Sequence, residues 1–254
     1  MQLVTTQRQA EPGKARLALS LASTPGEVRE VQRLRYKVFI EGGGLARLMN
    51  EERLDRDRFD DCCDHLLVRD MATLEVVGTY RLLNPKGAQK LGELYCEGEF
   101  DLRRLAHLRA RLVEAGRACI HPDYRSGAVI MMLWSGMADY MRRNGCEYLI
   151  GCASISLADG GAQANAVFQQ LSRDGHLSPP EYRAPPRLAF PLHGDTDIAP
   201  ALPPLLKGYL RSGAWVCGEP AWDPEFHCAD LLVLLPLANL DERYARRYLG
   251  DKAA

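Results

Sequence analysis

An acid, a base and a turn follow one another in the middle of the chain. Glu114 and Arg117 fall on a predicted strand, and Arg125, Ser126 and Gly127 form a turn before a predicted helix. A carboxylate can take a proton from an amine, and the N–H groups of a turn and of a helix N-terminus bind anions. This segment therefore suits an enzyme that deprotonates an amine while it holds a phosphate-bearing acyl carrier.

The geometry of the predicted strand decides whether Glu114 and Arg117 can act together. Residues three apart in a regular strand face opposite sides of the sheet. A β-bulge at Gly116 would bring both side chains to one face. Without the bulge, one of the two serves only a structural ion pair. His121 is the second candidate for the base, although a His before a turn more often supports the loop by hydrogen bonds.

A second set of charged residues permits two interpretations. Arg35, Asp57, Asp60 and Arg81 supply two acids and two guanidinium groups. The acids can bind the ammonium group of an amino acid, while an Arg binds its carboxylate as a fork. Alternatively, the four side chains hold one another and order a loop. The Asp–His pair at residues 64–65 opens a predicted strand and is interpreted as structural.

The composition restricts the class of protein. The chain has 254 residues, of which 46% are hydrophobic, and a formal net charge of -1, which argues against a strongly basic nucleic-acid-binding protein. The eight cysteines form no CxxC pair, and without a secretory signal they predict a reduced, cytoplasmic protein with small thiol residues in its core. No spacing of His, Cys and Asp indicates a metal site, so no metal is expected. The longest apolar run, residues 231–237, is too short to cross a bilayer.

The apolar periodicity predicts a mixed α/β protein. Residues 1–14 are polar and are expected to form a flexible tail, and residues 15–254 are expected to form a single domain with a C-terminal extension from about residue 179. Thr24 is expected to cap the first helix. Residues 84–89 are predicted to be a loop. Helices are predicted over 25–41, 101–112, 126–143, 162–171, 205–211 and 239–249, and strands over 65–69, 75–83, 115–120, 147–152, 187–191, 214–217 and 230–235.

Short motifs stand in a fixed order along most of the chain. They are Leu34-Arg35-Tyr36-Lys37-Val38-Phe39, Asp57-Arg58-Phe59-Asp60, Cys63-Asp64-His65-Leu66-Leu67-Val68, Tyr80-Arg81-Leu82-Leu83, Gly98-Glu99-Phe100-Asp101-Leu102, Glu114-Ala115-Gly116-Arg117, Leu133-Trp134-Ser135-Gly136 and Gly151-Cys152-Ala153-Ser154. Together they resemble the GNAT-like acyltransferases that use acyl-carrier-protein thioesters, and most of all the ornithine lipid acyltransferase family, often labelled hemolysin-like. The skeleton is also similar to that of the acyl-homoserine-lactone synthases.

The resemblance implies a GNAT-like α/β fold, in which a mixed, twisted sheet is flanked by helices and splays at the strand of Glu114. It implies direct transfer of a fatty, 3-hydroxy acyl group from acyl carrier protein to the α-amine of ornithine, giving lyso-ornithine lipid. The phosphopantetheine thioester is then a co-substrate, and no cofactor is tightly bound. Glu114 and Arg117 would be catalytic, and Arg125, Ser126 and Gly127 would receive the carrier arm. The implied substrate-binding residues are Arg35, Phe39, Asp57, Asp60, Arg81 and Trp134.

The resemblance leaves alternatives. The turn Arg125-Ser126-Gly127-Ala128-Val129-Ile130 lacks the second glycine of the ordinary acetyl-CoA pattern, which disfavours tight binding of the coenzyme A pyrophosphate and leaves room for a phosphopantetheine arm. The acceptor could be another amino acid, as in N-acyl amino acid or acyl-homoserine-lactone synthases, although the C-terminal extension argues against the latter. A non-enzymatic, membrane-interacting protein would need a long apolar or amphipathic surface, which the sequence does not show. Trp134 is explained better by core packing than by a cofactor-binding role.

Two basic patches offer surfaces for partners. Arg103, Arg104, His107, Arg109 and Arg111 stand within nine residues without an acid. They form either a solvated helix face or a dock for an acidic acyl carrier protein. The second patch, residues 244–248, could rest on anionic lipid, which would place the protein peripherally on the inner face of the membrane.

Overall fold

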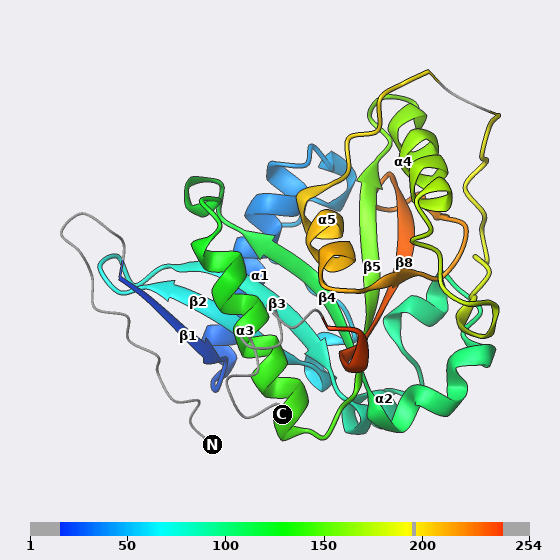
Figure 1. Cartoon of the computed structure of the whole chain (residues 1–254). Helices are drawn as coiled ribbons and strands as arrows, with labels where there is room; N and C mark the ends of the chain where they lie inside the picture. Colours follow the sequence, from blue (N-terminus) through cyan, green and yellow to red (C-terminus); the bar gives the residue numbers. More distant parts are fainter. Residues whose placement is uncertain (1–15, 195–196, 241–254) are drawn as a thin grey trace. The chain divides into compact units, whose positions relative to one another are not determined.

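The computed structural model describes residues 16–194 and 197–240 (Figure 1). These residues divide into two compact units. The first unit contains residues 16–90 and 115–144, and the second contains residues 91–114, 145–194 and 197–240. The tail predicted for residues 1–14, almost all of the helix predicted for 239–249 and the basic patch at 244–248 lie outside the described residues. The expectation of a single domain over 15–254 stays a prediction.

The first unit begins with a strand and a capped helix. Strand β1, Leu17–Leu21, was not expected from the sequence. Helix α1, Pro25–Arg35, starts as predicted, because the Thr24 side chain accepts a hydrogen bond from the Glu27 amide at 3.2 Å. The helix continues into a π-helical turn, Tyr36–Glu41, which ends before the glycines that follow.

The strands of the first unit follow the order β1-β2-β3-β4. Strands β2, Asp64–Asp70, and β3, Val76–Leu83, form the predicted antiparallel hairpin, and β1 pairs with β2. Leu67 joins the apolar cluster of helix α1, whereas its neighbour Leu66 faces helix α3, Ala128–Arg143. Since successive strand residues point to opposite faces, α1 and α3 cover opposite sides of these strands.

Helix α3 lies very close to the strands because two positions have no side chain. A Cβ at Gly78 of β3 would come within 2.3 Å of a Val129 methyl group on α3. A Cβ at Gly136 of α3 would come within 2.7 Å of Leu19 on β1. Helix α3 confirms the helix predicted for residues 126–143 and ends, as expected, at Asn144.

The second unit is a mixed sheet in the order β4-β5-β8-β6. The first residues of β4, Leu112–Ile120, run parallel to β5, Tyr148–Ser156, over Leu112 to Glu114. Strand β8, Cys228–Pro236, is buried throughout and pairs antiparallel with β5 along its whole length (Figure 1). The short strands β6, Trp215–Val216, and β7, Ala221–Asp223, also pair with β8. Helices α4, Ala162–Arg173, and α5, Pro204–Arg211, lie where they were predicted.

Three local predictions were wrong, for identifiable reasons. Residues 84–89 are not a loop, because helix α2, Pro85–Leu91, begins there with the Asn84 side chain accepting a hydrogen bond from the Gly87 amide at 2.9 Å. The α-helix predicted for 101–112 is a run of 3₁₀ turns, Arg103–Arg111. Its leucines at 102, 105 and 108 recur every third residue, which fits three residues per turn.

The third wrong prediction is the strand at residues 187–191. Only an isolated bridge joins Ala189 to Ala221 there. The flanking prolines at 185, 186 and 191 have no N–H to donate, so the ladder cannot extend. Shorter helical turns complete the described chain: Ala46–Leu48, Asp60–Cys62, Tyr95–Gly98, Pro122–Tyr124, Pro180–Tyr182 and Leu237–Asn239. Within residues 16–194 and 197–240, none of the helices is long and apolar enough to cross a membrane.

Candidate functional site

The first unit holds a buried cluster of three Arg and three Asp residues, which we call the Arg–Asp cluster. Its members are Arg35, Asp55, Asp57, Asp60, Arg81 and Arg117. Five of these were singled out in the sequence, and Asp55 was missed. The formal charges of the six side chains cancel within the cluster.

Arg35 is the centre of the Arg–Asp cluster and is fully buried at the end of α1. Its Nε donates to Asp55 Oδ2 at 2.8 Å, and its Nη1 and Nη2 donate to the two oxygens of Asp60 at 3.0 and 2.7 Å. Arg81 donates to Asp60 at 3.0 Å and to Asp57 at 2.6 Å. Every carboxylate of the cluster therefore faces at least one guanidinium group.

Arg117 completes the Arg–Asp cluster from strand β4. Its Nη2 lies 3.2 Å from Asp57 and its Nε lies 3.5 Å from Asp55. The backbone at Arg117 has a φ of 51°, so the irregularity expected near Gly116 falls one residue later. Arg117 thus has its own acidic partners.

The electrostatics of the Arg–Asp cluster favour the network interpretation. Burial alone would raise the pKa of Asp60, but the hydrogen bond and charge of Arg35, with the charge of Arg81, hold that pKa well below its ordinary value. His65 also fits its structural interpretation, since its Nε2 lies 3.3 Å from the Asp60 carbonyl oxygen. Asp64 accepts hydrogen bonds from Tyr140 at 2.6 Å and from Asn84 at 3.2 Å. The substrate-binding roles of Arg35, Asp57, Asp60 and Arg81 stay predictions.

The remaining candidates of the first unit lie in the core or in an exposed turn. Phe39 packs, half-buried, against the apolar cluster of α1, and Trp134 is buried on α3. Arg125 and Ser126 are exposed, and Gly127 precedes α3 with a φ of 95°, a conformation that favours glycine. Close to this turn, Nε2 of His121 lies 2.8 Å from Lys37 Nζ.

Glu114 lies in the second unit and is 4% exposed. The parallel pairing of β4 with β5 ends at this residue, which lies opposite Ile150. Both carboxylate oxygens accept backbone hydrogen bonds at 2.7 Å, one from the Tyr95 amide and one from the Cys96 amide. The two donors fix the orientation of the carboxylate, which has further lone pairs for a proton or a water.

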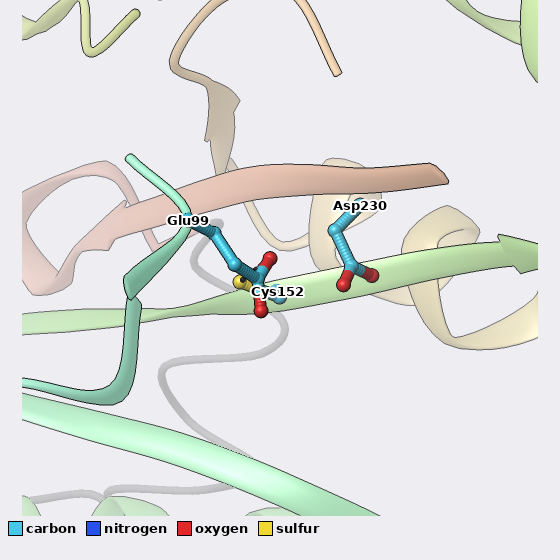
Figure 2. Close-up of side chains that lie close together, drawn as sticks. All are labelled: Glu99, Cys152 and Asp230. Atoms are coloured by element: carbon cyan, nitrogen blue, oxygen red, sulfur yellow. Dashed lines mark hydrogen bonds between the residues drawn. The ribbon is translucent and has the colours of Figure 1, made fainter. Parts of the chain in front are cut away.

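A cluster of carboxyl and thiol groups lies in the same unit, and the sequence did not indicate it. Figure 2 shows Glu99 together with Cys152 of β5 and Asp230 of β8. One donor atom from each lies within 4.8 Å of the other two, and a second set, Asp223, Cys228 and Asp230, shares Asp230. We call the five residues the carboxyl–thiol cluster. Carboxylate and thiol atoms this close can surround a cation, so the expectation that no metal binds stays a prediction.

Two acids of the carboxyl–thiol cluster, Glu99 and Asp230, have raised pKa values, so their ionised forms are disfavoured. Burial, followed by the charge of Asp230, raises the pKa of Glu99 to about 9. Burial is also the main cause that raises the pKa of Asp230, and the charge of Asp223 adds to it. None of the described Lys, Arg or His residues forms an ion pair with Glu99, Asp223 or Asp230.

The Cys96 and Cys152 thiols are poor candidates for a nucleophile, because their pKa values are raised. Cys152 Sγ lies 3.4 Å from Cys96 Sγ and 3.5 Å from Glu99 Oε2. The hydrogen bond with Cys96, followed by burial, raises the pKa of the Cys152 thiol well above its ordinary value. Since the thiolate is the attacking form, a protonated thiol is a poor nucleophile.

The basic residues of the 3₁₀ segment have acidic or carbonyl partners, unlike a free cationic face. Arg103 pairs with Asp101, Arg109 with Glu97 and Arg111 with Glu147, while Arg104 Nη1 donates to the Pro180 carbonyl at 3.1 Å. A pocket of about 650 Å³ adjoins this segment. It is lined by Asp101, Arg103, Arg104, Arg183, Ala184, Pro185, Pro186, Cys217, Gly218 and Glu219. The docking role of Arg103, Arg104 and Arg109 stays a prediction.

Sequence signals existed for part of what was missed. Glu99 stands inside one of the quoted motifs, but no role was derived for it. Asp230 is an acid at the start of an otherwise apolar strand, which indicates a buried charge that needs an explanation. Asp55 lies two residues before Asp57 in a charged, irregular segment, and no sequence feature distinguishes it from the other acids there.

Comparisons with known proteins agree on the kind of molecule. The family model described as an acetyltransferase (GNAT) domain matches residues 34–135. An L-ornithine N(alpha)-acyltransferase of Rhodobacter capsulatus is 37% identical over 91% of this chain and 93% of that protein, and one of Brucella abortus is 34% identical over 91% and 88%. The crystal structure of the AHL synthase LasI aligns with a TM-score of 0.51 at 12% identity, over 93% of this chain and 96% of that chain. The structural likeness confirms the predicted GNAT-like fold.

Proposed function

The chain belongs to the L-ornithine N(alpha)-acyltransferase family, and we propose that it transfers a fatty acyl group from the thioester of an acyl carrier protein to the α-amine of ornithine. The product is an N-acylated ornithine, the lyso-ornithine lipid, and the acyl group is a 3-hydroxy fatty acid. The names of the relatives support the acceptor and the bond that forms. The observation in this chain that carries the proposal is the buried carboxylate of Glu114, held by two backbone amides.

In this mechanism Glu114 acts as the general base. An α-ammonium group cannot attack a carbonyl, so Glu114 takes a proton from it, directly or through one water. The amine nitrogen then attacks the thioester carbon. A C–N bond forms and the C–S bond breaks. The second proton of the attacking nitrogen passes to the departing phosphopantetheine thiolate, and Glu114 releases the proton that it took to solvent. No covalent enzyme intermediate is required, in line with the protonated state of the Cys152 thiol.

The other candidate residues hold the two substrates. Arg125, Ser126 and Gly127 receive the phosphate of the phosphopantetheine arm, and Arg103, Arg104 and Arg109 dock the acidic carrier protein. The Arg–Asp cluster, with Phe39 and Trp134, supports the amino acid end of the acceptor. Within this cluster the Asp57 side chain is 24% exposed, more than those of Asp55 and Asp60.

The proposed place of reaction follows from the two substrates. Acyl carrier protein and free ornithine are water-soluble, whereas the acylated product partitions into lipid. We therefore assign the reaction to the cytoplasm, with peripheral contact at the inner face of the membrane when the product leaves. Cell fractionation with antibody detection tests this assignment.

The test of the proposed function is an assay with purified protein and a carrier protein loaded with a 3-hydroxy fatty acid. Ornithine, lysine, glycine and S-adenosylmethionine are offered separately, and products are identified by mass spectrometry. We expect N-acylornithine as the main product, and we expect Glu114→Gln to lower its rate by ~10²–10⁴. The matched control is Glu147→Gln, which changes an exposed acid directly before strand β5.

Three results would contradict the proposal. A folded Glu114→Gln variant with normal turnover would remove Glu114 from the role of base. Preference for glycine would keep acyl transfer and reject ornithine. A lactone formed from S-adenosylmethionine would assign the protein to the signal-synthase activity.

A further inference from the structure

Ornithine carries a second amine, and the acids first expected to bind it are already occupied. Asp57 and Asp60 form ion pairs with Arg81, Arg117 and Arg35 at distances of 2.6 to 3.2 Å. A substrate ammonium there would have to displace a guanidinium group that is already paired with these acids. The side-chain ammonium of the acceptor therefore needs acids elsewhere.

The carboxyl–thiol cluster has acids without a cationic partner. Asp230 is 3% exposed, and its Oδ1 has no hydrogen-bond partner among the described residues. Its carboxylate lies within 4.8 Å of donor atoms of Glu99 and Cys152 (Figure 2). The other oxygen, Oδ2, accepts a hydrogen bond from the Cys228 thiol at 3.8 Å. An oxygen without a donor on a buried acid is costly unless a ligand donates to it.

We propose that Glu99 and Asp230 bind the side-chain ammonium of the ornithine acceptor, with Cys152 beside them. The inference rests on the proposed function, because it assigns the second amine of the same substrate. An ammonium group has three donors and no acceptor, so it complements two carboxylates and a sulfur atom that accepts weakly. Glu99 and Cys152 are half-buried, whereas Asp230 is buried.

The electrostatics of the empty cluster support the assignment. Burial is the main cause that raises the pKa of both Glu99 and Asp230; the charge of Asp230 adds to the rise at Glu99, and the charge of Asp223 adds to the rise at Asp230. A bound ammonium group would offset these negative charges and favour the ionised carboxylates. The site would then discriminate strongly against an acceptor that lacks the second amine, since such an acceptor would leave the buried acids unpaired.

The cluster is joined to the proposed base through a few short contacts. The Cys96 amide donates to Glu114 at 2.7 Å, and the Cys96 thiol lies 3.4 Å from the Cys152 thiol, which in turn lies 3.5 Å from Glu99. One short segment, residues 95–99, therefore supplies both the amides that orient Glu114 and one acid of the cluster. This arrangement suits a substrate whose two amine nitrogens are joined through a flexible chain of four carbons.

The test compares ornithine with norvaline, which has the same carbon chain without the terminal amine. We expect wild-type protein to prefer ornithine in kcat/KM by ~10² or more. In Glu99→Gln and Asp230→Asn the value for ornithine should fall by a similar factor, mainly through KM, while norvaline keeps its wild-type rate. Glu147→Gln, an exposed acid of the same unit, should keep the wild-type preference. Urea unfolding establishes that each variant is folded, and Glu99→Gln serves alone if Asp230→Asn does not fold.

The outcomes separate the two proposals. If wild-type protein acylates ornithine and both variants keep its preference over norvaline, the ammonium site is wrong and the proposed function stands. If wild-type protein acylates neither acceptor, the proposed function fails and the inference fails with it. If wild-type protein binds one equivalent of Zn²⁺ that Asp230→Asn does not bind and that ornithine does not displace, the cluster is a metal site and the ammonium assignment is overturned.

Discussion

The molecule contains two clusters of buried ionisable groups, and they differ in whether the buried acids have cationic partners. The Arg–Asp cluster of the first unit matches three carboxylates with three guanidinium groups. The carboxyl–thiol cluster of the second unit gathers Glu99, Asp223 and Asp230 without a described cationic partner. The charges of the first cluster balance one another, whereas the negative charges of the second are balanced only when it holds a proton or receives a cation.

This difference separates a structural role from a binding role. Removing one partner from a buried ion pair leaves an uncompensated charge, so such pairs hold a local structure firmly once it has formed. A buried acid without a partner instead lowers the stability of the empty protein. Such a cost is expected where a ligand later supplies the missing charge.

The largest difference in stability is expected when an Asp is replaced by Asn in each of the two clusters. Asp60→Asn removes a carboxylate that neutralises Arg35 and Arg81, and we expect it to lower the free energy of unfolding by ~3–5 kcal/mol. Asp230→Asn removes a buried acid that has no cationic partner among the described residues, and it should leave the stability unchanged or raise it by ~1 kcal/mol. Urea denaturation followed by circular dichroism measures both values.

Asp61→Asn, an exposed neighbour of Asp60, is the control and should not change the urea midpoint. Loss of stability in Asp230→Asn of the same size as in Asp60→Asn would show that Asp230 has a cationic partner in solution. The contrast between the clusters would then be lost.

The pH dependence of stability should also differ between the two clusters. The pKa of Glu99 rises from its ordinary value of 4.5 to about 9 on folding, so the folded protein keeps a proton that the unfolded chain releases. Stability should therefore fall as the pH rises from 4.5 to about 9. The pKa of Asp60 is lowered on folding, so its contribution is present above the ordinary value of 3.8 and is lost as the pH falls below it.

Urea midpoints measured from pH 3 to pH 9 test this dependence. Glu99→Gln should reduce the fall of the urea midpoint at alkaline pH and leave its fall at acid pH unchanged. A fall at alkaline pH that survives in Glu99→Gln would mean that another group releases the proton.

The smallest effect on stability is expected at the exposed ion pairs of the 3₁₀ segment. Arg103 has 91% of its side chain exposed and, among the described residues, forms an ion pair only with Asp101. The double variant Arg103→Glu, Arg104→Glu should keep the wild-type urea midpoint, but it should raise KM for acyl carrier protein several-fold with little change in kcat. Added salt should raise the wild-type KM in the same way, since exposed charges are screened within about 10 Å at 0.1 M salt. Kinetics that do not depend on salt would show that these arginines are only a solvated surface.

The sequence predicted the elements whose signals are local. Thr24, Pro25 and Glu27 placed the start of α1, and the turn at Asn144 placed the end of α3. Strand β1 was missed because all its residues are half-buried and give no clear alternation. Helix α2 was missed although Asn84 and Pro85 form a recognisable start, which was interpreted as a loop.

The site was predictable only where its members stand in motifs. Arg35, Asp57, Asp60, Arg81 and Arg117 were named, but sequence could not tell mutual pairing from substrate binding. The choice depends on distances that the fold sets. The carboxyl–thiol cluster could not be assembled from the sequence, because Glu99 lies on a short turn, while Cys152 and Asp230 lie on neighbouring strands β5 and β8 that pair only in the folded chain.

The close approach of α3 to the strands has a consequence for genetics. At Gly78 even a methyl group would meet a Val129 methyl group of α3 at 2.3 Å, so a substitution there displaces the helix instead of altering any group that does chemistry. The same helix carries Trp134 and begins directly after Gly127. Alanine at Gly78 is thus the kind of allele that a screen for heat-sensitive growth should recover, with activity retained in the cold and lost on warming.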